Sequence, residues 1–196
     1  PQSEQRTRVP RPLQIVSWNA NSLVGDRLHD LSDELAWADV IAVQGTRLRA
    51  GHIPARKLAA TAHTAISWGW SRTKWSNKSA GVAILLSPRL QASLQQHYSP
   101  PSPLAGRVGA VRVRTNQEDV LLINIYVPPP TSLSHGTYVA LLEAIFQWVQ
   151  HLLATAPTRT MPILLGDLNT GFGQVDHNLD MDVVGPTGWG KRQWTS

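Results

Sequence analysis

The chain has 196 residues, of which 42% are hydrophobic, enough for one folded domain with a buried core. Its formal net charge of +5 comes from 14 arginines and 4 lysines against 13 acidic residues. It has no cysteine, which excludes disulfide bonds, thiolate zinc sites and cysteine nucleophiles, and no run of about 18 apolar residues, so we expect no membrane-spanning helix.

The N-terminal segment is polar, basic and rich in proline. Residues 1–12 contain no apolar core segment, which argues against a signal peptide, and they lack an initiator methionine. We expect them to form a flexible arm that precedes a domain spanning 13–196. We also expect the chain to be a piece of a longer protein.

The first half of the domain mixes strand and helix signals. Leucines and an alanine at helical spacing predict a helix with an acidic outer face over 27–38, and the apolar run at 40–43 predicts a buried strand. The expected order is strand 13–18, helix 27–38, strand 40–43, short helix 54–62, strand 64–70, a polar basic loop and strand 81–87.

The second half begins with a proline-rich stretch, 99–106, that we expect to be a loop. Alternating valine and arginine over 107–115, followed by the apolar run 120–127, predicts a β-hairpin. A broad apolar stripe over 138–154 predicts the longest helix, and 161–167 predicts a further buried strand. Strands separated by helices, together with an antiparallel hairpin, indicate an α/β or α+β fold with mixed sheets.

Four of the expected strands end in polar residues of similar character. These residues are Asn19 and Asn21 after the first strand, Gln44, Gly45 and Thr46 after the second, Tyr126 in the hairpin, and Asp167 and Asn169 after the last strand. Carboxylate and amide oxygens can bind a metal ion, amide N–H groups can bind phosphate, and a tyrosine hydroxyl can donate to an oxyanion. Each also has a structural interpretation, because Asp and Asn form turns and a tyrosine before proline packs.

The basic residues are concentrated in one part of the chain. From Val40 to Gln117 there are eleven lysines and arginines and no acidic residue. Such a block favours a polyanionic partner, although it is also compatible with an ordinary soluble surface. We expect nucleic-acid contacts from Arg47 and from Arg72, Lys74 and Lys78, which alternate with tryptophans.

The sequence lacks the common motifs for nucleotide cofactors and for zinc. It has neither G-x-G-x-x-G nor G-x-x-x-x-G-K-[ST], so a nucleotide cofactor is not expected. Its seven histidines are scattered without an H-E-x-x-H pattern, so zinc is not expected either.

Five short stretches occur in a characteristic order. They are IVSWNANSL (15–23), DVIAVQGTRL (39–48), AGVAILLS (80–87), LLINIYVPP (121–129) and PILLGDLNT (162–170). Together they resemble the endonuclease/exonuclease/phosphatase superfamily, which includes apurinic/apyrimidinic endonucleases, and most closely the endonuclease domains of non-LTR retrotransposons. The glycine-rich stretch at 184–194 is similar to the one that follows the GDLN strand in retroelement endonucleases. The resemblance implies a four-layer α/β sandwich of two mixed sheets flanked by helices, incomplete at its C-terminus.

The resemblance also implies hydrolysis of a DNA phosphodiester by a nicking endonuclease that uses Mg²⁺ or Mn²⁺. Asp167 would orient or deprotonate the attacking water, and Asn169 and Tyr126 would contact the phosphate. Asn19 and Asn21 would lie beside the metal, with Asn21 and Asp167 as its ligands. The implied partner is DNA rather than a membrane, with a reverse transcriptase downstream in the parent protein and an intracellular, nuclear location.

Two departures from the family pattern bear on activity. Gly45 stands where the family has its principal metal-ligand glutamate, and the Ser-Asp-His motif near the family's C-terminus is absent. We therefore expect weakened metal affinity and little or no hydrolysis. Three hypotheses remain open: an impaired DNA-nicking endonuclease, a non-catalytic nucleic-acid-binding remnant, and a phosphatase or phospholipid phosphodiesterase on the same fold.

Overall fold

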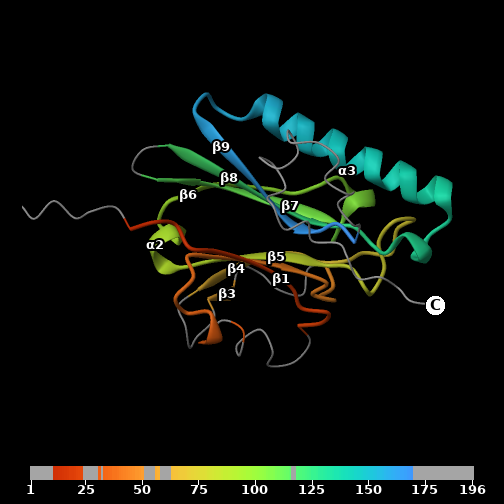
Figure 1. Ribbon diagram of the computed structural model, residues 1–196, viewed down its shortest axis with the longest axis horizontal. Coiled ribbons are helices and arrows are strands. Elements are labelled where there is room, and N and C mark those ends of the chain that lie inside the picture. Colours follow the sequence, from red (N-terminus) through yellow and green to blue (C-terminus); the bar gives the residue numbers. More distant parts are fainter. Residues whose placement is uncertain are drawn as a thin grey trace, which may run out of the picture.

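Two β-sheets lie face to face, and helix α3 (His135–Thr155) crosses the outer face of one of them (Figure 1). The computed structural model describes residues 11–23, 31, 33–50, 56–57, 63–115 and 118–169. The expected arm over 1–10 and the glycine-rich stretch at 184–194 lie outside the described residues. Over the ranges that are described, no helix is both long and apolar enough to cross a membrane.

The first sheet has five strands in the order β1-β2-β5-β4-β3. Its strands are β1 (Ile15–Asn19), β2 (Val40–Gln44), β3 (Arg56–Lys57), β4 (Thr64–Trp68) and β5 (Val82–Leu86). β1 runs parallel to β2 and the remaining pairs are antiparallel. Every residue of β2 and β5 is buried, as their continuous apolar sequences predict for central strands covered on both faces.

The second sheet has four strands in the order β6-β7-β8-β9. Its strands are β6 (Leu94–Tyr98), β7 (Val108–Arg114), β8 (Asp119–Tyr126) and β9 (Thr160–Asp167). β7 and β8 form the predicted hairpin, and β9 is parallel to β8. Helix α3 supplies the crossover that a parallel pair requires.

Three apolar clusters account for the layers. Residues of β8 alternate between two of them, because successive side chains of a strand point to opposite faces. Ile123 packs with Leu141 and Ile145 of α3, whereas Leu122 packs with Ile84 between the sheets. The third cluster covers the other face of the first sheet and joins Ile41, Leu85 and Leu31. The predicted four-layer sandwich of mixed sheets is confirmed.

The helix predicted over 54–62 is wrong where the structure describes it. Arg56 and Lys57 form β3, with Lys57 opposite Thr64 of β4. Pairing with the next strand at the sheet edge satisfies the backbone of this segment, and that pairing overrides its local helical tendency. Of the helix predicted over 27–38, residues 31 and 33–34 are helical and 35–37 form a turn, and the other positions before 35 lie outside the described residues.

Several short elements were not predicted. Proline at residue 88 follows β5 and begins the short helix α2 (Pro88–Gln91), because proline fits the first helical position. β6 has the polar sequence LQQHY and is an edge strand whose backbone pairs with β7. The stretch predicted as a loop also contains a 3₁₀ turn, Ser102–Leu104, which buries Leu104.

The strand predicted over 161–167 is present as β9, but it is not buried as predicted. Leu164 of β9 is 51% exposed and Met161 is 41% exposed. β9 lies at the edge of its sheet, and β1, whose Trp18 is 42% exposed, lies at the edge of the other. Each strand therefore has a neighbour on one side only among the residues described.

A buried amide pair joins the two sheets near the ends of β2 and β8. The side chain of Asn124 in β8 is fully buried and donates through Nδ2 to the carbonyls of Val43 (3.0 Å) and Ala83 (2.9 Å). Its Oδ1 accepts a hydrogen bond from Nε2 of Gln44 at 2.7 Å. Gln44 Nε2 also lies 3.2 Å from the Ser17 hydroxyl of β1. These contacts connect β1, β2, β5 and β8 at one point.

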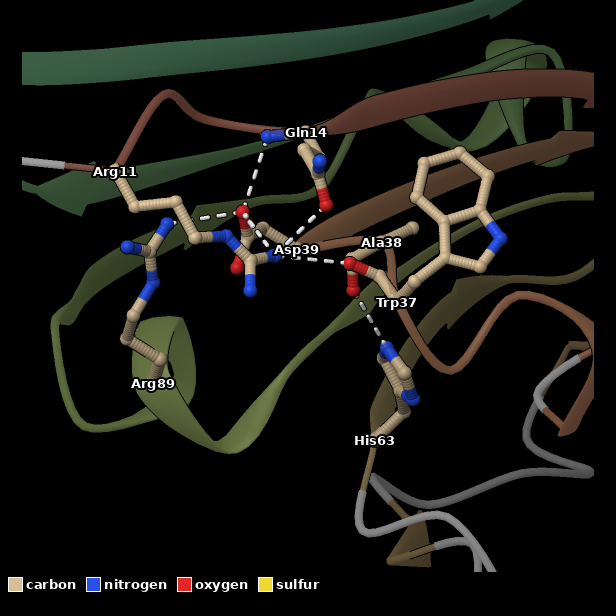
Figure 2. Close-up of polar contacts among 7 residues, drawn as sticks. All are labelled: Arg11, Gln14, Trp37, Ala38, Asp39, His63 and Arg89. Carbon is tan, nitrogen blue, oxygen red and sulfur yellow. Dashed lines mark hydrogen bonds and ion pairs between the residues drawn. The ribbon is translucent and has the colours of Figure 1, made fainter.

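Asp39 fixes the opposite end of β2 (Figure 2). Its carboxylate is buried and accepts the backbone N–H of Gln14 at 3.0 Å. The same oxygen forms ion pairs with Arg89 of the α2 helix (2.9 Å) and with Arg11 (3.5 Å). These arginines hold the entry to β1 and helix α2 against the start of β2.

The inter-sheet amide pair generates a stability prediction. Gln44→Ala and Asn124→Ala should each lower the free energy of unfolding by about 1–3 kcal/mol, because each leaves buried polar groups without partners. The double variant should lose less than the sum, since the two changes remove one shared hydrogen bond. Urea unfolding followed by tryptophan fluorescence measures all three variants. Strictly additive losses would contradict a direct energetic link between the sheets at this point.

Candidate active site

The polar strand ends of the two sheets meet at Asn19 and Asp167. Asn19 ends β1 in the first sheet, and Asp167, 148 residues later in the chain, ends β9 in the second. Nδ2 of Asn19 donates to Oδ2 of Asp167 at 2.6 Å. The structure therefore brings the first and last of the predicted polar strand ends into direct contact.

Asn169 completes the surroundings of the Asp167 carboxylate. Its backbone N–H donates to Oδ1 of Asp167 at 2.9 Å, and its Nδ2 lies 3.2 Å from Oδ2. Nδ2 also donates to the carbonyl of Val127 at 2.7 Å. Both carboxylate oxygens thus accept N–H groups from the protein, which orients the carboxylate and balances part of its charge.

Tyr126 lies beside this carboxylate. It is the register partner of Asp167 in the parallel β8–β9 pair, so the two side chains leave the same face of the sheet. Tyr126 is half-buried and packs with the apolar cluster between the sheets. This position puts the Tyr126 side chain beside the strand ends that carry Asp167 and Asn19.

Arg107 is a neighbour of Tyr126 that sequence reasoning missed. Its guanidinium lies 5.4 Å from the centre of the Tyr126 ring, and its Nε donates to the carbonyl of Trp75 at 2.7 Å. Burial lowers the pKa of Arg107 to about 10, while the Tyr126 hydroxyl acts in the opposite direction, so Arg107 is charged at neutral pH. The alternation of valine and arginine over 107–115 does not distinguish Arg107 from Arg112 and Arg114. In the structure, Arg112 and Arg114 pair with Asp119.

A second part of the site lies on the loop after β2. Nη2 of Arg47 donates to Oδ1 of Asn21 at 2.9 Å. The backbone N–H of Asn21 donates to Oδ1 of Asn19 at 3.2 Å. One chain of hydrogen bonds therefore runs from Asp167 through Asn19 and Asn21 to the Arg47 guanidinium.

Gly45 and Arg47 in this loop, and Asn21 in the loop after β1, have left-handed backbone geometry. The φ angles are +63° at Gly45, +58° at Arg47 and +49° at Asn21. This region costs most residues with a Cβ about 1–2 kcal/mol, and asparagine tolerates it better than arginine does. Gly45 is therefore more than a loop residue, because a Cβ there would lie 2.8 Å from Oδ1 of Asn19.

Contacts with the segment between β4 and β5 hold Arg47 in this conformation. Its backbone N–H donates to the carbonyl of Ala80 at 3.0 Å, and its carbonyl accepts the Trp70 indole N–H at 3.0 Å. The preceding residue, Thr46, donates its N–H to the carbonyl of Gly81 at 3.0 Å. The strained backbone is thus fixed on both sides by hydrogen bonds.

The other predicted nucleic-acid contacts lie on this segment between β4 and β5. Arg72, Lys74 and Lys78 are exposed, and Nζ of Lys74 lies 3.9 Å from the centre of the Trp75 ring. These three side chains are separate from the chain of hydrogen bonds around Asp167. The segment that carries them is hydrogen-bonded to Arg47 near its start, through Trp70, and near its end, through Ala80.

Comparison with known proteins identifies a family and several similar folds. Residues 16–195 match the sequence model of the Endonuclease/Exonuclease/phosphatase family. The fold is similar to the APE2 catalytic domain of Xenopus laevis, with a TM-score of 0.62 and 20% identity over 84% of this chain and 60% of that one. An AP endonuclease from Archaeoglobus fulgidus gives a TM-score of 0.61 and 20% identity over 86% of this chain and 62% of that one.

A third similar structure is that of the 3′ phosphatase NExo from Neisseria, bound to a product DNA hairpin. It gives a TM-score of 0.60 and 24% identity over 88% of this chain and 63% of that one. The chain thus spans less than two thirds of the length of these three structures. At these identities the likeness establishes the fold. No curated protein sequence matches the chain significantly.

The geometry at Gly45 generates a matched pair of substitutions. Gly45→Ala should lower the free energy of unfolding by about 1–2 kcal/mol, because the left-handed backbone then carries a Cβ. Gly136→Ala is the control, since a Cβ at this position in α3 meets no atom within 4 Å. It should be neutral or stabilise the protein by up to about 1 kcal/mol. Urea unfolding compares the two, and equal effects at both positions would contradict the special geometry of Gly45.

Proposed function

The chain belongs to the endonuclease/exonuclease/phosphatase family, and from that premise we propose that it binds the phosphodiester backbone of DNA and hydrolyses it weakly or not at all. The observation that carries the proposal is the arrangement at the strand ends. Asp167, held by Asn19 and Asn169 and flanked by Tyr126, offers a base and donors for a phosphate, whereas Gly45 offers no carboxylate beside them.

The roles that we propose for these residues follow from their chemistry. Asp167 can orient or deprotonate a water molecule, and the hydroxyl of Tyr126 can donate to a phosphate oxygen. The amide of Asn169 can contact a phosphate oxygen when one of its N–H groups leaves Val127 or Asp167. Asn19 holds the Asp167 carboxylate through the 2.6 Å hydrogen bond, and so acts on its orientation. Donors aimed at developing negative charge are what hydrolysis of a phosphodiester requires from a protein.

DNA as the partner is supported by charge. The stretch from Val40 to Gln117 has eleven basic and no acidic residues. Arg47, Arg72, Lys74 and Lys78 belong to it and are all exposed. One of the similar structures holds a DNA hairpin, which favours DNA over a lipid or an inositol phosphate.

Weak hydrolysis is supported by the set of available donors. Nucleases of this family generally use divalent metals, and Mg²⁺ is usually held by one or two carboxylates together with water and phosphate. Over the described residues, no group of three or more His, Cys, Asp or Glu side chains could hold a metal ion. Asp167 is the carboxylate at the site, and both of its oxygens accept N–H groups. These residues do not fit a metal centre well.

We further propose that the parent protein is a retroelement endonuclease that acts in the nucleus and is followed by a reverse transcriptase. The five ordered motifs and the glycine-rich stretch at 184–194 support this origin. Translation of the parent reading frame beyond residue 196 tests it. A Ser-Asp-His motif followed by a reverse transcriptase is the expected result, and an unrelated sequence would contradict it.

A plasmid-nicking assay tests the catalytic half of the proposal. With Mg²⁺ or Mn²⁺, the chain should relax supercoiled plasmid at least about 100-fold more slowly than a family endonuclease that has the glutamate, because loss of metal-binding groups costs at least that order. Any residual nicking should disappear in Asp167→Asn. Rapid nicking that Asp167→Asn abolishes would contradict the proposed impairment.

Salt dependence tests the binding half. The logarithm of the affinity for duplex DNA should fall linearly as the logarithm of the salt concentration rises. Lys74→Gln and Lys78→Gln should each reduce the magnitude of that slope by about one, which is the contribution of one phosphate contact. Arg89→Gln is a charge-matched control, because Arg89 is paired with the buried Asp39. Fluorescence anisotropy measures the slopes, and an affinity that does not change with salt would refute electrostatic binding.

A further inference from the structure

The site contains a fixed positive charge that is not a metal ion. The guanidinium of Arg47 is held by Oδ1 of Asn21 at 2.9 Å, and Asn21 in turn contacts Asn19, which binds Asp167. Arginine has five N–H donors, and the hydrogen bond to Asn21 uses one of them. The side chain is exposed, so the remaining donors are accessible to a ligand.

The oxygens around this charge are already engaged with N–H groups. Oδ1 of Asn21, one of the two metal ligands that the sequence predicted, accepts the Arg47 guanidinium. The oxygens of Asp167, the other predicted ligand, accept the N–H groups of Asn19 and Asn169. A divalent cation that used Asn21 would have to displace a guanidinium and then lie beside it. Like charges in such proximity repel each other.

The backbone at Arg47 is strained and is held in place by its neighbours. Its φ of +58° lies in the region that favours glycine, yet the residue there is arginine. Ala80 and Trp70 hold its N–H and carbonyl, and Gly81 holds the preceding Thr46. Strain that the surrounding structure over-determines in this way is concentrated at ligand-binding sites.

We propose that the Arg47 guanidinium, oriented by Asn21, binds a DNA phosphate at the place where a divalent cation would otherwise act, so that this site binds DNA without a metal. The inference rests on the proposed function and specifies how that same site holds its ligand. A planar guanidinium suits the task, because it donates two parallel N–H groups to phosphate oxygens and is positively charged at neutral pH.

Binding of a fluorescein-labelled duplex oligodeoxynucleotide, measured by anisotropy at constant ionic strength, tests the inference. The wild-type chain should bind equally well or better in EDTA than in MgCl₂. Arg47→Gln should weaken binding in EDTA by about tenfold, the usual effect of one charge-assisted hydrogen bond. Arg49→Gln removes the same charge two residues away, where the guanidinium lies 5.8 Å from the Trp70 ring, and should weaken binding by no more than about threefold.

A second variant separates binding from folding. Arg47→Gly keeps the left-handed backbone without strain, so its midpoint of urea unfolding should equal or exceed that of the wild type. Its DNA affinity should nevertheless fall as in Arg47→Gln. A residue that reduces stability and increases affinity is expected at a binding site.

The outcomes distinguish the inference from the proposed function. Wild-type binding that requires Mg²⁺, or that Arg47→Gln and Arg49→Gln weaken equally, would overturn the metal-free site and leave DNA binding intact. The metal-free site would also be overturned if Arg47→Gly binds DNA as tightly as the wild type does. If the wild-type chain binds no DNA in either EDTA or MgCl₂, both the inference and the proposed function fail.

Discussion

The hydrogen bonds of Asn124 determine how the two sheets meet. This one buried amide donates to Val43 and Ala83 in the first sheet and accepts from Gln44. Burying an amide costs free energy unless its hydrogen bonds are made, so the sheets have one favourable relative position at this point. The contact between Asn19 and Asp167, which belong to different sheets, depends on that position because neither strand pairs with the other.

The backbone at Gly45 connects the fold to the chemistry of the site. A left-handed residue at the end of β2 turns the chain so that Arg47, two residues later, reaches Asn21. A side chain at position 45 would be strained and would crowd Asn19. The absence of a carboxylate at residue 45 and the presence of a guanidinium beside Asn21 therefore belong to one local arrangement. A glutamate introduced at this position would carry a Cβ on a left-handed backbone and would also lie near Arg47.

Much of the fold could be predicted from sequence, and the failures have identifiable physical causes. The buried strands β2 and β5, the β7–β8 hairpin and α3 follow from local apolar patterns, and the polar residues at the strand ends were found because they end predicted strands. β3 and β6 were missed because backbone pairing with the next strand, rather than an apolar pattern of their own, defines them. Arg107 and the contact of Arg47 with Asn21 escaped because burial, ring stacking and a positive φ leave no periodic signal.

The metal-free site that we propose requires a guanidinium rather than a divalent cation to contact the phosphate. The most direct measurement is NMR of the chain with ¹⁵N-labelled arginine during addition of duplex DNA in EDTA. We expect the Nε–Hε signal of Arg47 to shift as DNA binds and the signal of Arg49 to shift less. A shift of Arg47 that appears only after Mg²⁺ is added, or DNA binding that leaves the Arg47 signal unmoved, would contradict the metal-free site.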